Sequence, residues 1–272
     1  MEDIIRYLHD RFALNASIFD ETFLERTITN RMNFSSCKST GDYLIQLNKV
    51  PSEAVSLIDS LTNSYSEFFR NPLTFSLIKQ VIFPRIFEKK DTLYNHDIRI
   101  WSAGCAAGQE AYSLAMLALD YIQEHQLTTS FRIFATDISA RQIESARNGV
   151  YDLKAVYNTN QGLLNSYFTV KGQSYAISER LKKYVDFSCY DLLDKNTIAP
   201  PSSIFGGFDI IMCCNVLFYY KPDIQKDILN KLSLSLNMDG FLLTGEAEIA
   251  IVRNEQNLRQ FVLPSTVFMK RA

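Results

Sequence analysis

From residue 97 onward the chain alternates apolar, strand-like runs with amphipathic helical segments, and this alternation constrains the fold more than any other feature. The expected strands are residues 98–103, 131–136, 185–188, 208–213 and 240–245, and the expected helices are residues 110–121, 140–147 and 222–236. Strands joined by helices form a mostly parallel sheet with helices on both faces. We therefore predict an α/β fold that binds its ligand at the carboxyl ends of the strands.

The first 75 residues follow a different pattern. Apolar residues recur there at helical spacing, which predicts several helices. Residues 39–42 are a helix-start signal, and Pro51 suits the first turn of the next helix. A chain of 272 residues is also longer than a single hydrophobic core usually accommodates. We expect a small all-α domain over residues 1–75 and an α/β domain over residues 76–272.

A short segment interrupts the alternation between residues 151 and 180. Residues 167–170 and 174–177 are two β-prone runs, and they flank Lys171 and Gly172, which favour a turn. This pattern predicts a β-hairpin. We expect a small β-subdomain at about residues 155–180, inserted in the α/β domain.

Composition argues against several classes of protein. The formal net charge is −2, whereas a nucleic-acid platform needs a basic surplus. The N-terminus is acidic and lacks an apolar segment, and the longest apolar stretch, residues 204–220, is too short to cross a bilayer. Five cysteines without C-x-x-C spacing indicate reduced thiols, and three scattered histidines predict no metal site. We expect a cytoplasmic protein without membrane insertion.

Two strand ends carry residues suited to a nucleoside. The small residues of the turn at 104–108 let a backbone approach a ligand at the start of the next helix. Asp137 ends the second strand, where a carboxylate can accept from both ribose hydroxyls. The G-x-G-x-x-G fingerprint of dinucleotide enzymes is missing. Asp137 alone also fits a helix cap, but together with the turn it favours a nucleoside site.

Two further segments carry candidate functional groups. Asn215 and Tyr219 follow the strand at residues 208–213, which places a polar group and an aromatic ring near the same sheet edge. The segment 66–70 combines a hydroxyl with two phenylalanines and Arg70. Its spacing alone favours a capped helix with a solvated arginine.

Five ordered motifs resemble the chemotaxis receptor methyltransferases, the CheR family. They are residues 66–70, 101–113, 135–138, 149–151 and 214–220. The resemblance spans about residues 60–250. It implies a Rossmann-like methyltransferase fold with a helical N-terminal domain and an inserted β-subdomain. It also implies S-adenosylmethionine as methyl donor, S-adenosylhomocysteine as product, and receptor glutamates as acceptors that become methyl esters.

The resemblance further implies roles for individual residues. Arg70 and Tyr219 lie nearest the transferring methyl, with Arg70 orienting the acceptor carboxylate, and Asp137 holds the ribose. The other implied cofactor contacts are Ser64, Ser66, Glu110, Asp191, Leu192, Cys214 and Asn215. The chain departs from the family at Ser64, Ser66, Asp191 and Cys214, where Asn, Thr, Asn and Arg are usual.

The resemblance also implies a partner, the cytoplasmic domain of a methyl-accepting receptor, and we expect a monomeric enzyme. In the family, basic residues of the helical domain meet this acidic partner. The basic residues here are Arg6, Arg11, Arg26, Arg31, Lys38 and Lys49. Two alternatives stay open: a methyltransferase with another acceptor, such as a protein amine, a small molecule or RNA, and a catalytically silent protein that binds cofactor or receptor.

Overall fold

A computed structural model describes residues 1–62, 65–91, 97–203 and 207–271 and divides them into two compact units. The first unit is Met1–Asn63 with Val216–Gln225, and the second is Ser64–Asn215 with Lys226–Ala272. The domain boundary expected at residue 75 stays a prediction. No helix within the described ranges has the length and apolar character needed to span a membrane.

The first unit is helical, as the sequence predicts. Its elements are α1 (Glu2–Phe12), η1 (Ala16–Ile18), α2 (Glu21–Phe34), α3 (Thr40–Lys49), α4 (Pro51–Leu61) and η3 (Leu217–Tyr219). Ser39 caps α3 by accepting from the Asp42 N–H, and Pro51 opens α4, so both predicted helix starts are confirmed. The segment after β7 joins this unit because Tyr220 stacks on Phe19 at 5.5 Å between ring centroids.

A buried polar cluster ties α2, α3 and α4 together. Arg31 makes two hydrogen bonds to the Glu53 carboxylate, at 2.9 and 2.5 Å, and the fully buried Tyr43 hydroxyl donates to the same group at 2.8 Å. Burial opposes ionisation of Glu53, but the bonds from Arg31 and Tyr43 lower its pKa. Arg31 therefore serves the fold, although the sequence placed it among the basic residues available to a receptor.

Replacing Glu53 with alanine is expected to lower the free energy of unfolding by about 3 kcal/mol, the lower end of the cost of breaking a buried ion pair. The reason is that Arg31 and Tyr43 lose their shared acceptor. Urea unfolding followed by circular dichroism measures the change. Glu25→Ala on the exposed side of α2 is the matched control, and equal midpoints for the two variants would contradict the assignment.

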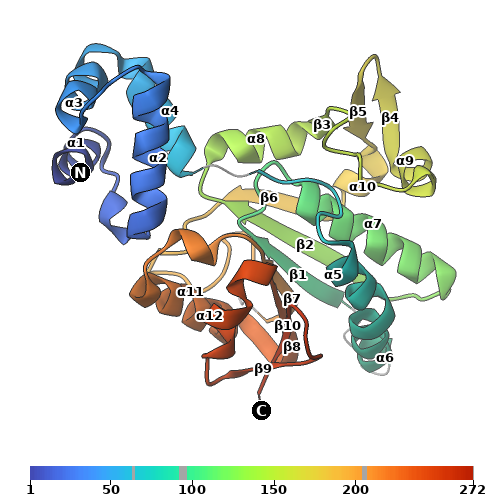
Figure 1. Ribbon diagram of the computed structural model, residues 1–272. Helices are drawn as coiled ribbons and strands as arrows, with labels where there is room; N and C mark the ends of the chain where they lie inside the picture. The colour runs from blue at the N-terminus through green and yellow to red at the C-terminus, as the bar shows by residue number, and fades with distance from the viewer. Residues whose placement is uncertain (63–64, 92–96, 204–206, 272) are drawn as a thin grey trace. The chain divides into compact units, whose positions relative to one another are not determined.

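The second unit is built on a seven-stranded sheet (Figure 1). Its strands, in the order β6-β2-β1-β7-β8-β10-β9, are β6 (Val185–Cys189), β2 (Ser130–Asp137), β1 (Asp97–Ala103), β7 (Phe208–Cys213), β8 (Leu236–Thr244), β10 (Val267–Lys270) and β9 (Leu258–Gln260). The first five run parallel, whereas β10 is antiparallel to β8 and β9. The five predicted strands are thus confirmed, and the antiparallel pair is an addition.

Helices cover this sheet because its central strands are apolar on both faces. Ile100 of β1 shares one face with its partners Ile133 and Ile210. Trp101 and its partner Ile211 share the opposite face, and all five residues are fully buried. The covering helices are α5 (Pro72–Leu77), η2 (Ile78–Ile82), α6 (Phe83–Asp91), α7 (Gln109–Glu124), α8 (Ala140–Asn148), α11 (Pro222–Ser235), η4 (Glu246–Glu248) and α12 (Ile249–Arg253). The parallel strands all end at one edge, which is the binding edge of a Rossmann-like fold.

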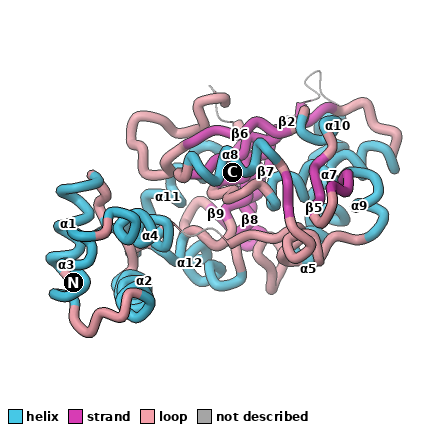
Figure 2. The backbone as a smooth tube through the Cα atoms, turned by 90° about the horizontal axis from the view of Figure 1, so that it is seen from above, coloured by secondary structure: helices cyan, strands magenta, loops and turns pink. Residues whose placement is uncertain are grey.

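A second, small sheet stands at one side of the large sheet, near α7 (Figures 1 and 2). It has the order β3-β5-β4, with β3 (Val150–Tyr151), β4 (Phe168–Lys171) and β5 (Ser174–Ile177). The helices α9 (Gln161–Tyr167) and α10 (Glu179–Lys182) flank it. The predicted hairpin is confirmed, and β3 adds a third strand that pairs with β5.

Candidate active site

The loop after β1 brings main chain to the binding edge. The N–H groups of Gly104 and Cys105 both donate to the Thr136 carbonyl at 2.8 Å, which anchors the loop to the end of β2. Gly108 then has φ +90°, and a Cβ on it would lie 2.9 Å from the Ala146 Cβ. Only glycine fits this position, because other residues meet both backbone strain and a clash. The loop therefore leads into α7 with no side chain at the helix start.

Asp137 holds this loop from the end of β2. Its Oδ2 accepts from the Ala106 N–H and its Oδ1 from the Ser139 N–H, both at 2.9 Å. Burial raises the pKa of the carboxyl group, against the lowering effect of these backbone bonds. Ser139, not Asp137, caps α8 by accepting from the Gln142 N–H. The helix-cap interpretation of Asp137 is therefore wrong, and each oxygen keeps a lone pair for a ligand.

Glu110 lies in the first turn of α7, one turn from the loop. Its Oε1 accepts from the Ser102 hydroxyl at 2.7 Å, and the Cys214 thiol also hydrogen-bonds the carboxyl group. Burial raises the pKa of Glu110 to about 8, although these bonds and the charge of Arg70 favour the ionised form. A buried carboxyl group with a raised pKa suits a cationic ligand, because the ligand would bind the ionised form of the group.

The end of β7 depends on a residue that the sequence did not single out. The buried Glu248 carboxylate accepts from the Asn215 N–H at 2.9 Å and from the Gly245 N–H at 2.7 Å. Asn215 is held at φ +61°, a left-handed conformation that asparagine tolerates. A Cβ on Gly245 would lie 2.8 Å from the Asn215 amide nitrogen. Glu248 thus joins the ends of β7 and β8 and fixes Asn215.

The segment from Tyr65 to Arg70 is not helical, so the capped-helix alternative is wrong. Phe68 is fully buried and packs edge-on against Tyr151 and Phe168. Phe69 has φ +52° and donates its N–H to the Ser113 hydroxyl of α7 at 3.1 Å. A bulky residue in this conformation is uncommon and marks a constrained position. The two rings anchor the segment and leave Arg70 exposed.

The other predicted contacts take varied positions. Asp191 is exposed, lies two residues beyond β6 and accepts from the Leu193 N–H at 2.8 Å, while Leu192 and Ser66 are half-buried. Tyr219 belongs to the first unit, where its ring packs on Phe23 at 4.7 Å. Ser64 lies outside the described residues. The second unit therefore brings Arg70, Glu110 and Cys214 into one electrostatic cluster, and the roles of all these residues stay predictions.

Comparison with known proteins assigns the chain to a family. Residues 64–267 match the sequence model described as CheR methyltransferase, SAM binding domain. The chain belongs to the CheR methyltransferase family. It is an S-adenosylmethionine-dependent methyltransferase, and the predictions of the family, the Rossmann-like fold and the cofactor are confirmed.

Individual relatives agree with the CheR assignment. The chemotaxis protein methyltransferase of Borreliella burgdorferi is 29% identical over 97% of this chain and 91% of its own length. The chemotaxis protein methyltransferase of Vibrio parahaemolyticus is 34% identical over 71% of this chain and 68% of its own length. The probable biofilm formation methyltransferase WspC of Pseudomonas aeruginosa is 28% identical over 98% of this chain, which spans 60% of WspC. Among solved structures, the DszA carbon methyltransferase matches 89% of this chain and 50% of its own at 15% identity and TM-score 0.41.

The residues of this CheR protein fit S-adenosylmethionine chemically. Asp137 offers carboxylate acceptors to ribose hydroxyls, and Glu110 offers a negative charge to a sulfonium or ammonium group. Gly108 and Gly245 let the segments at this edge pack closely, since a Cβ on Gly108 would lie 2.9 Å from Ala146 and one on Gly245 would lie 2.8 Å from Asn215. The buried side-chain oxygen of Gln109, the first residue of α7, has no hydrogen-bond partner within the described part of the chain. An acceptor is thus available at this edge for a ligand donor.

Cofactor affinity is expected to increase with pH through Glu110. The pKa of this group is about 8 in the free enzyme, and a bound cation would lower it, so binding below pH 8 releases a proton. The dissociation constant of S-adenosylhomocysteine should therefore rise as pH falls below 8, approaching about tenfold per pH unit. Calorimetry from pH 6 to 9 in buffers of different ionisation enthalpy measures both the affinity and the released proton.

Glu110→Gln is the control for this pH dependence, because it removes the titrating proton and keeps the size of the side chain. The variant should bind with a nearly flat pH profile over the same range. An unchanged slope in the variant would assign the titration to another group.

Proposed function

We propose that this protein methylates glutamate side chains in the cytoplasmic domain of a methyl-accepting receptor, giving glutamyl methyl esters. The observation that carries the proposal is Arg70: its guanidinium is exposed, donates to the Tyr65 carbonyl at 3.0 Å, and its charge favours the ionised form of Glu110, although burial raises the pKa of that group to about 8. A fixed cation beside the cofactor cluster favours an anionic acceptor. Relatives named chemotaxis protein methyltransferase support methyl transfer in chemotaxis. We also propose that the enzyme acts as a cytoplasmic monomer.

The proposed chemistry asks the protein mainly for positioning. When bound, S-adenosylmethionine supplies an electrophilic methyl group on a positively charged sulfur. A glutamate acceptor has an ordinary pKa of about 4.3 and is ionised near pH 7, so no general base is needed. Arg70 orients the acceptor carboxylate, and Asp137 and Glu110 hold the two ends of the cofactor. Correct orientation alone can contribute about 7–11 kcal/mol to catalysis.

The supporting roles follow the same proposal. Ser64 and Ser66 close over the cofactor from the linker, Asp191 and Leu192 flank the adenine, and Cys214 and Asn215 flank the other end. The support for the last four is that they follow the ends of β6 and β7 at the carboxyl edge of the sheet. Tyr219 packs or hydrogen-bonds beside the methyl group.

Base treatment of labelled product tests the proposed acceptor. A receptor cytoplasmic domain is incubated with the enzyme and methyl-labelled S-adenosylmethionine, and the product is brought to high pH. A carboxyl methyl ester releases volatile methanol, whereas a methylated amine or nucleobase keeps its label. Label that is stable to base would overturn the carboxylate proposal. Cofactor binding without transfer to any receptor would favour a silent protein.

Similarity to WspC over 98% of the chain supports a second candidate, in which the acceptor receptor serves biofilm formation rather than chemotaxis. The carboxylate chemistry is the same in both cases. Receptors from each type of pathway, purified from one source organism and compared as substrates, distinguish the two candidates by their kcat/KM.

A further inference from the structure

We propose that Tyr151 is a positioning residue that holds the loop after β1 and the segment of Arg70 in one fixed arrangement. Residues 149–151 form one of the five sequence motifs, and the proposed function gives them no role. The inference rests on the proposed function, since it takes the loop as a cofactor contact and Arg70 as the acceptor contact. It adds a residue that acts on the reaction through both of these segments.

The hydroxyl group of Tyr151 fixes the loop after β1. It donates to the Ala107 carbonyl at 2.6 Å, and the side chain is buried, with 6% of its surface exposed. Burial raises the pKa of this hydroxyl well above its ordinary value, so the group stays protonated and remains a donor. The bond joins residues that are 44 positions apart in the chain, and it ties the small sheet to the loop.

The loop needs such a contact because its main chain is constrained. Ala106 has φ +50° and Gly108 has φ +90°, so left-handed conformations lie on both sides of Ala107. For alanine this conformation is unfavourable, and it persists only where the surrounding structure holds it. Asp137 accepts from the Ala106 N–H at 2.9 Å, and Tyr151 donates to the Ala107 carbonyl. The two side chains therefore fix neighbouring residues of the loop.

The ring of Tyr151 supports the segment that carries Arg70. Phe68 packs edge-on against this ring, with 4.9 Å between the ring centroids and 89° between the ring planes. Such aromatic pairs contribute more than their buried area alone. Phe68 is fully buried and also donates its N–H to the Ala155 carbonyl at 3.2 Å. Arg70 follows two residues later, so its main chain starts from a fixed point.

The local sequence explains how Tyr151 reaches both contacts. Gly149 ends α8 with φ +61°, a left-handed conformation that suits glycine at a helix end. Its carbonyl accepts from the Ile177 N–H of β5 at 2.8 Å, which fixes the start of β3. Val150 is then half-exposed and Tyr151 is buried, because successive side chains of a strand point to opposite faces.

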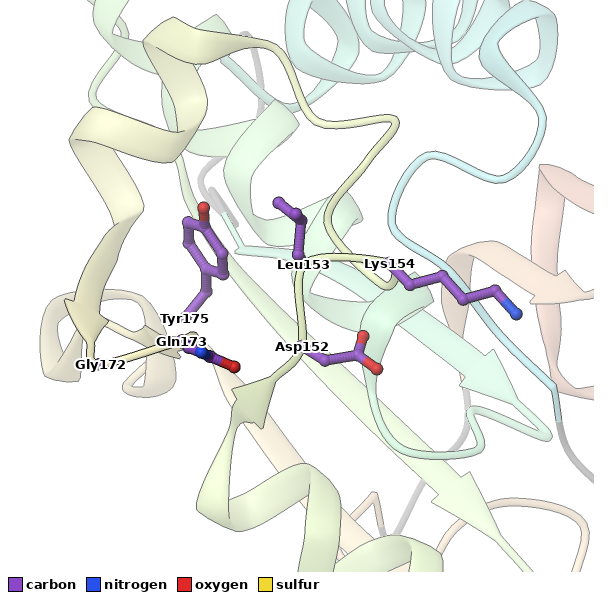
Figure 3. A pocket seen from close by; sticks show the side chains of 6 residues that line it. All are labelled: Asp152, Leu153, Lys154, Gly172, Gln173 and Tyr175. Atoms are coloured by element: carbon purple, nitrogen blue, oxygen red, sulfur yellow. The ribbon is translucent and has the colours of Figure 1, made fainter.

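The surface of the small sheet can be changed separately from Tyr151. A hollow of about 400 Å³ lies on this surface, and its lining residues are Asp152, Leu153, Lys154, Gly172, Gln173 and Tyr175. Figure 3 shows that these residues come from the segment after β3 and from the β4–β5 hairpin. A variant at Gln173, an exposed residue of the turn, changes the hollow and leaves the two contacts of Tyr151 in place.

Two substitutions separate the hydroxyl of Tyr151 from its ring. Tyr151→Phe removes the bond to the Ala107 carbonyl and should weaken the binding of S-adenosylhomocysteine about fivefold, the loss that corresponds to one hydrogen bond. Its kcat at saturating S-adenosylmethionine, measured with a receptor cytoplasmic domain, should stay close to that of the wild type, because Phe68 keeps its contact. Tyr151→Met also removes the ring and should lower this kcat about tenfold, since small errors of orientation slow the reaction strongly.

Two controls match these variants. Tyr167→Phe removes a hydroxyl bond of the same length, 2.6 Å, which joins the small-sheet region to Asp120 in the second half of α7. Gln173→Ala changes the hollow. Both variants should bind S-adenosylhomocysteine as the wild type does. Calorimetry gives the affinities, and urea unfolding shows that all four variants are folded under the assay conditions.

Wild-type affinity in Tyr151→Phe overturns the inference, and so does an equal loss of affinity in Tyr167→Phe. Equal kcat values for Tyr151→Met and Tyr151→Phe overturn the link to Arg70. Should Tyr151→Met not fold, Phe68→Met removes the other ring of the pair and is read by the same kcat.

The proposed function is tested separately from Tyr151. Affinity for S-adenosylhomocysteine needs no acceptor, whereas base-labile methanol from the wild-type enzyme reports the carboxylate acceptor. Label that is stable to base, together with weakened affinity in Tyr151→Phe, would overturn the proposed acceptor and support the role of Tyr151 at the loop. Methanol release together with unchanged affinity would support the acceptor and overturn the role of Tyr151.

Discussion

Replacing Asp137 with asparagine is expected to weaken the binding of S-adenosylhomocysteine by roughly 100-fold, because a hydrogen bond to a charged group contributes about 1.5–3 kcal/mol. The Asp137 carboxylate accepts from two main-chain N–H groups, one of them in the loop after β1. An amide group offers only one acceptor atom, so its NH₂ must face the Ala106 or the Ser139 N–H group, and the ribose hydroxyls lose one of their two acceptors. The loop and the ligand therefore both lose stabilisation.

Calorimetry of the purified variant measures this effect directly. Asp20→Asn is the matched control, since Asp20 also accepts a main-chain N–H at a helix start but lies in the first unit. Asparagine is an equally good cap, so this control should bind the cofactor product as the wild type does. Equal affinities of Asp137→Asn and Asp20→Asn for S-adenosylhomocysteine would show that Asp137 does not contribute to cofactor binding.

Replacing Arg70 with alanine is expected to reduce kcat for methyl transfer by about 10²–10³-fold, the usual cost of removing one preorganised charge-stabilising donor. The side chain is exposed, and its charge acts on the cofactor cluster through Glu110. Loss of that charge should also raise the pKa of Glu110, so the pH at which cofactor affinity declines should move upward. Single-turnover assays give the rate, and calorimetry against pH gives the shift.

Arg70→Lys separates charge from geometry. Lysine keeps the positive charge but not the planar pair of donors that matches a carboxylate, so it should restore the pH profile and only part of the rate. Full methyl transfer together with unchanged cofactor binding in Arg70→Ala would show that Arg70 has neither role.

The core of the fold could be predicted because local pattern and tertiary structure agree there. The strand at 208–213 is apolar at nearly every position, and it is fully buried between β1 and β8. The antiparallel pair of β9 and β10 could not be predicted from the sequence, because no strand–helix alternation leads into it. β3 is only two residues long, which is too short to show any periodicity.

The candidate site divides in the same way. The place of Asp137 at the end of β2 could be predicted, because it directly follows an apolar strand-like run, and its contact with the ribose stays a prediction. Glu248 could not be predicted, because its importance comes from Asn215, which lies 33 residues earlier and meets it only in the folded chain. The one local signal was the spacing of Gly245 and Glu248, three residues apart as in a capping box, but glycine lacks the capping side chain. For Arg31 the sequence suggested a role at the receptor, whereas the folded chain pairs it with Glu53.

The central claim is that the loop after β1 and the carboxylate at the end of β2 together hold the nucleoside of the cofactor. A crystal structure of the complex with S-adenosylhomocysteine tests it most directly. We predict both ribose hydroxyls within hydrogen-bond distance of the Asp137 oxygens, with the amino acid end beside Glu110. A ligand bound elsewhere, with Asp137 still contacting only the N–H groups of Ala106 and Ser139, would contradict the claim.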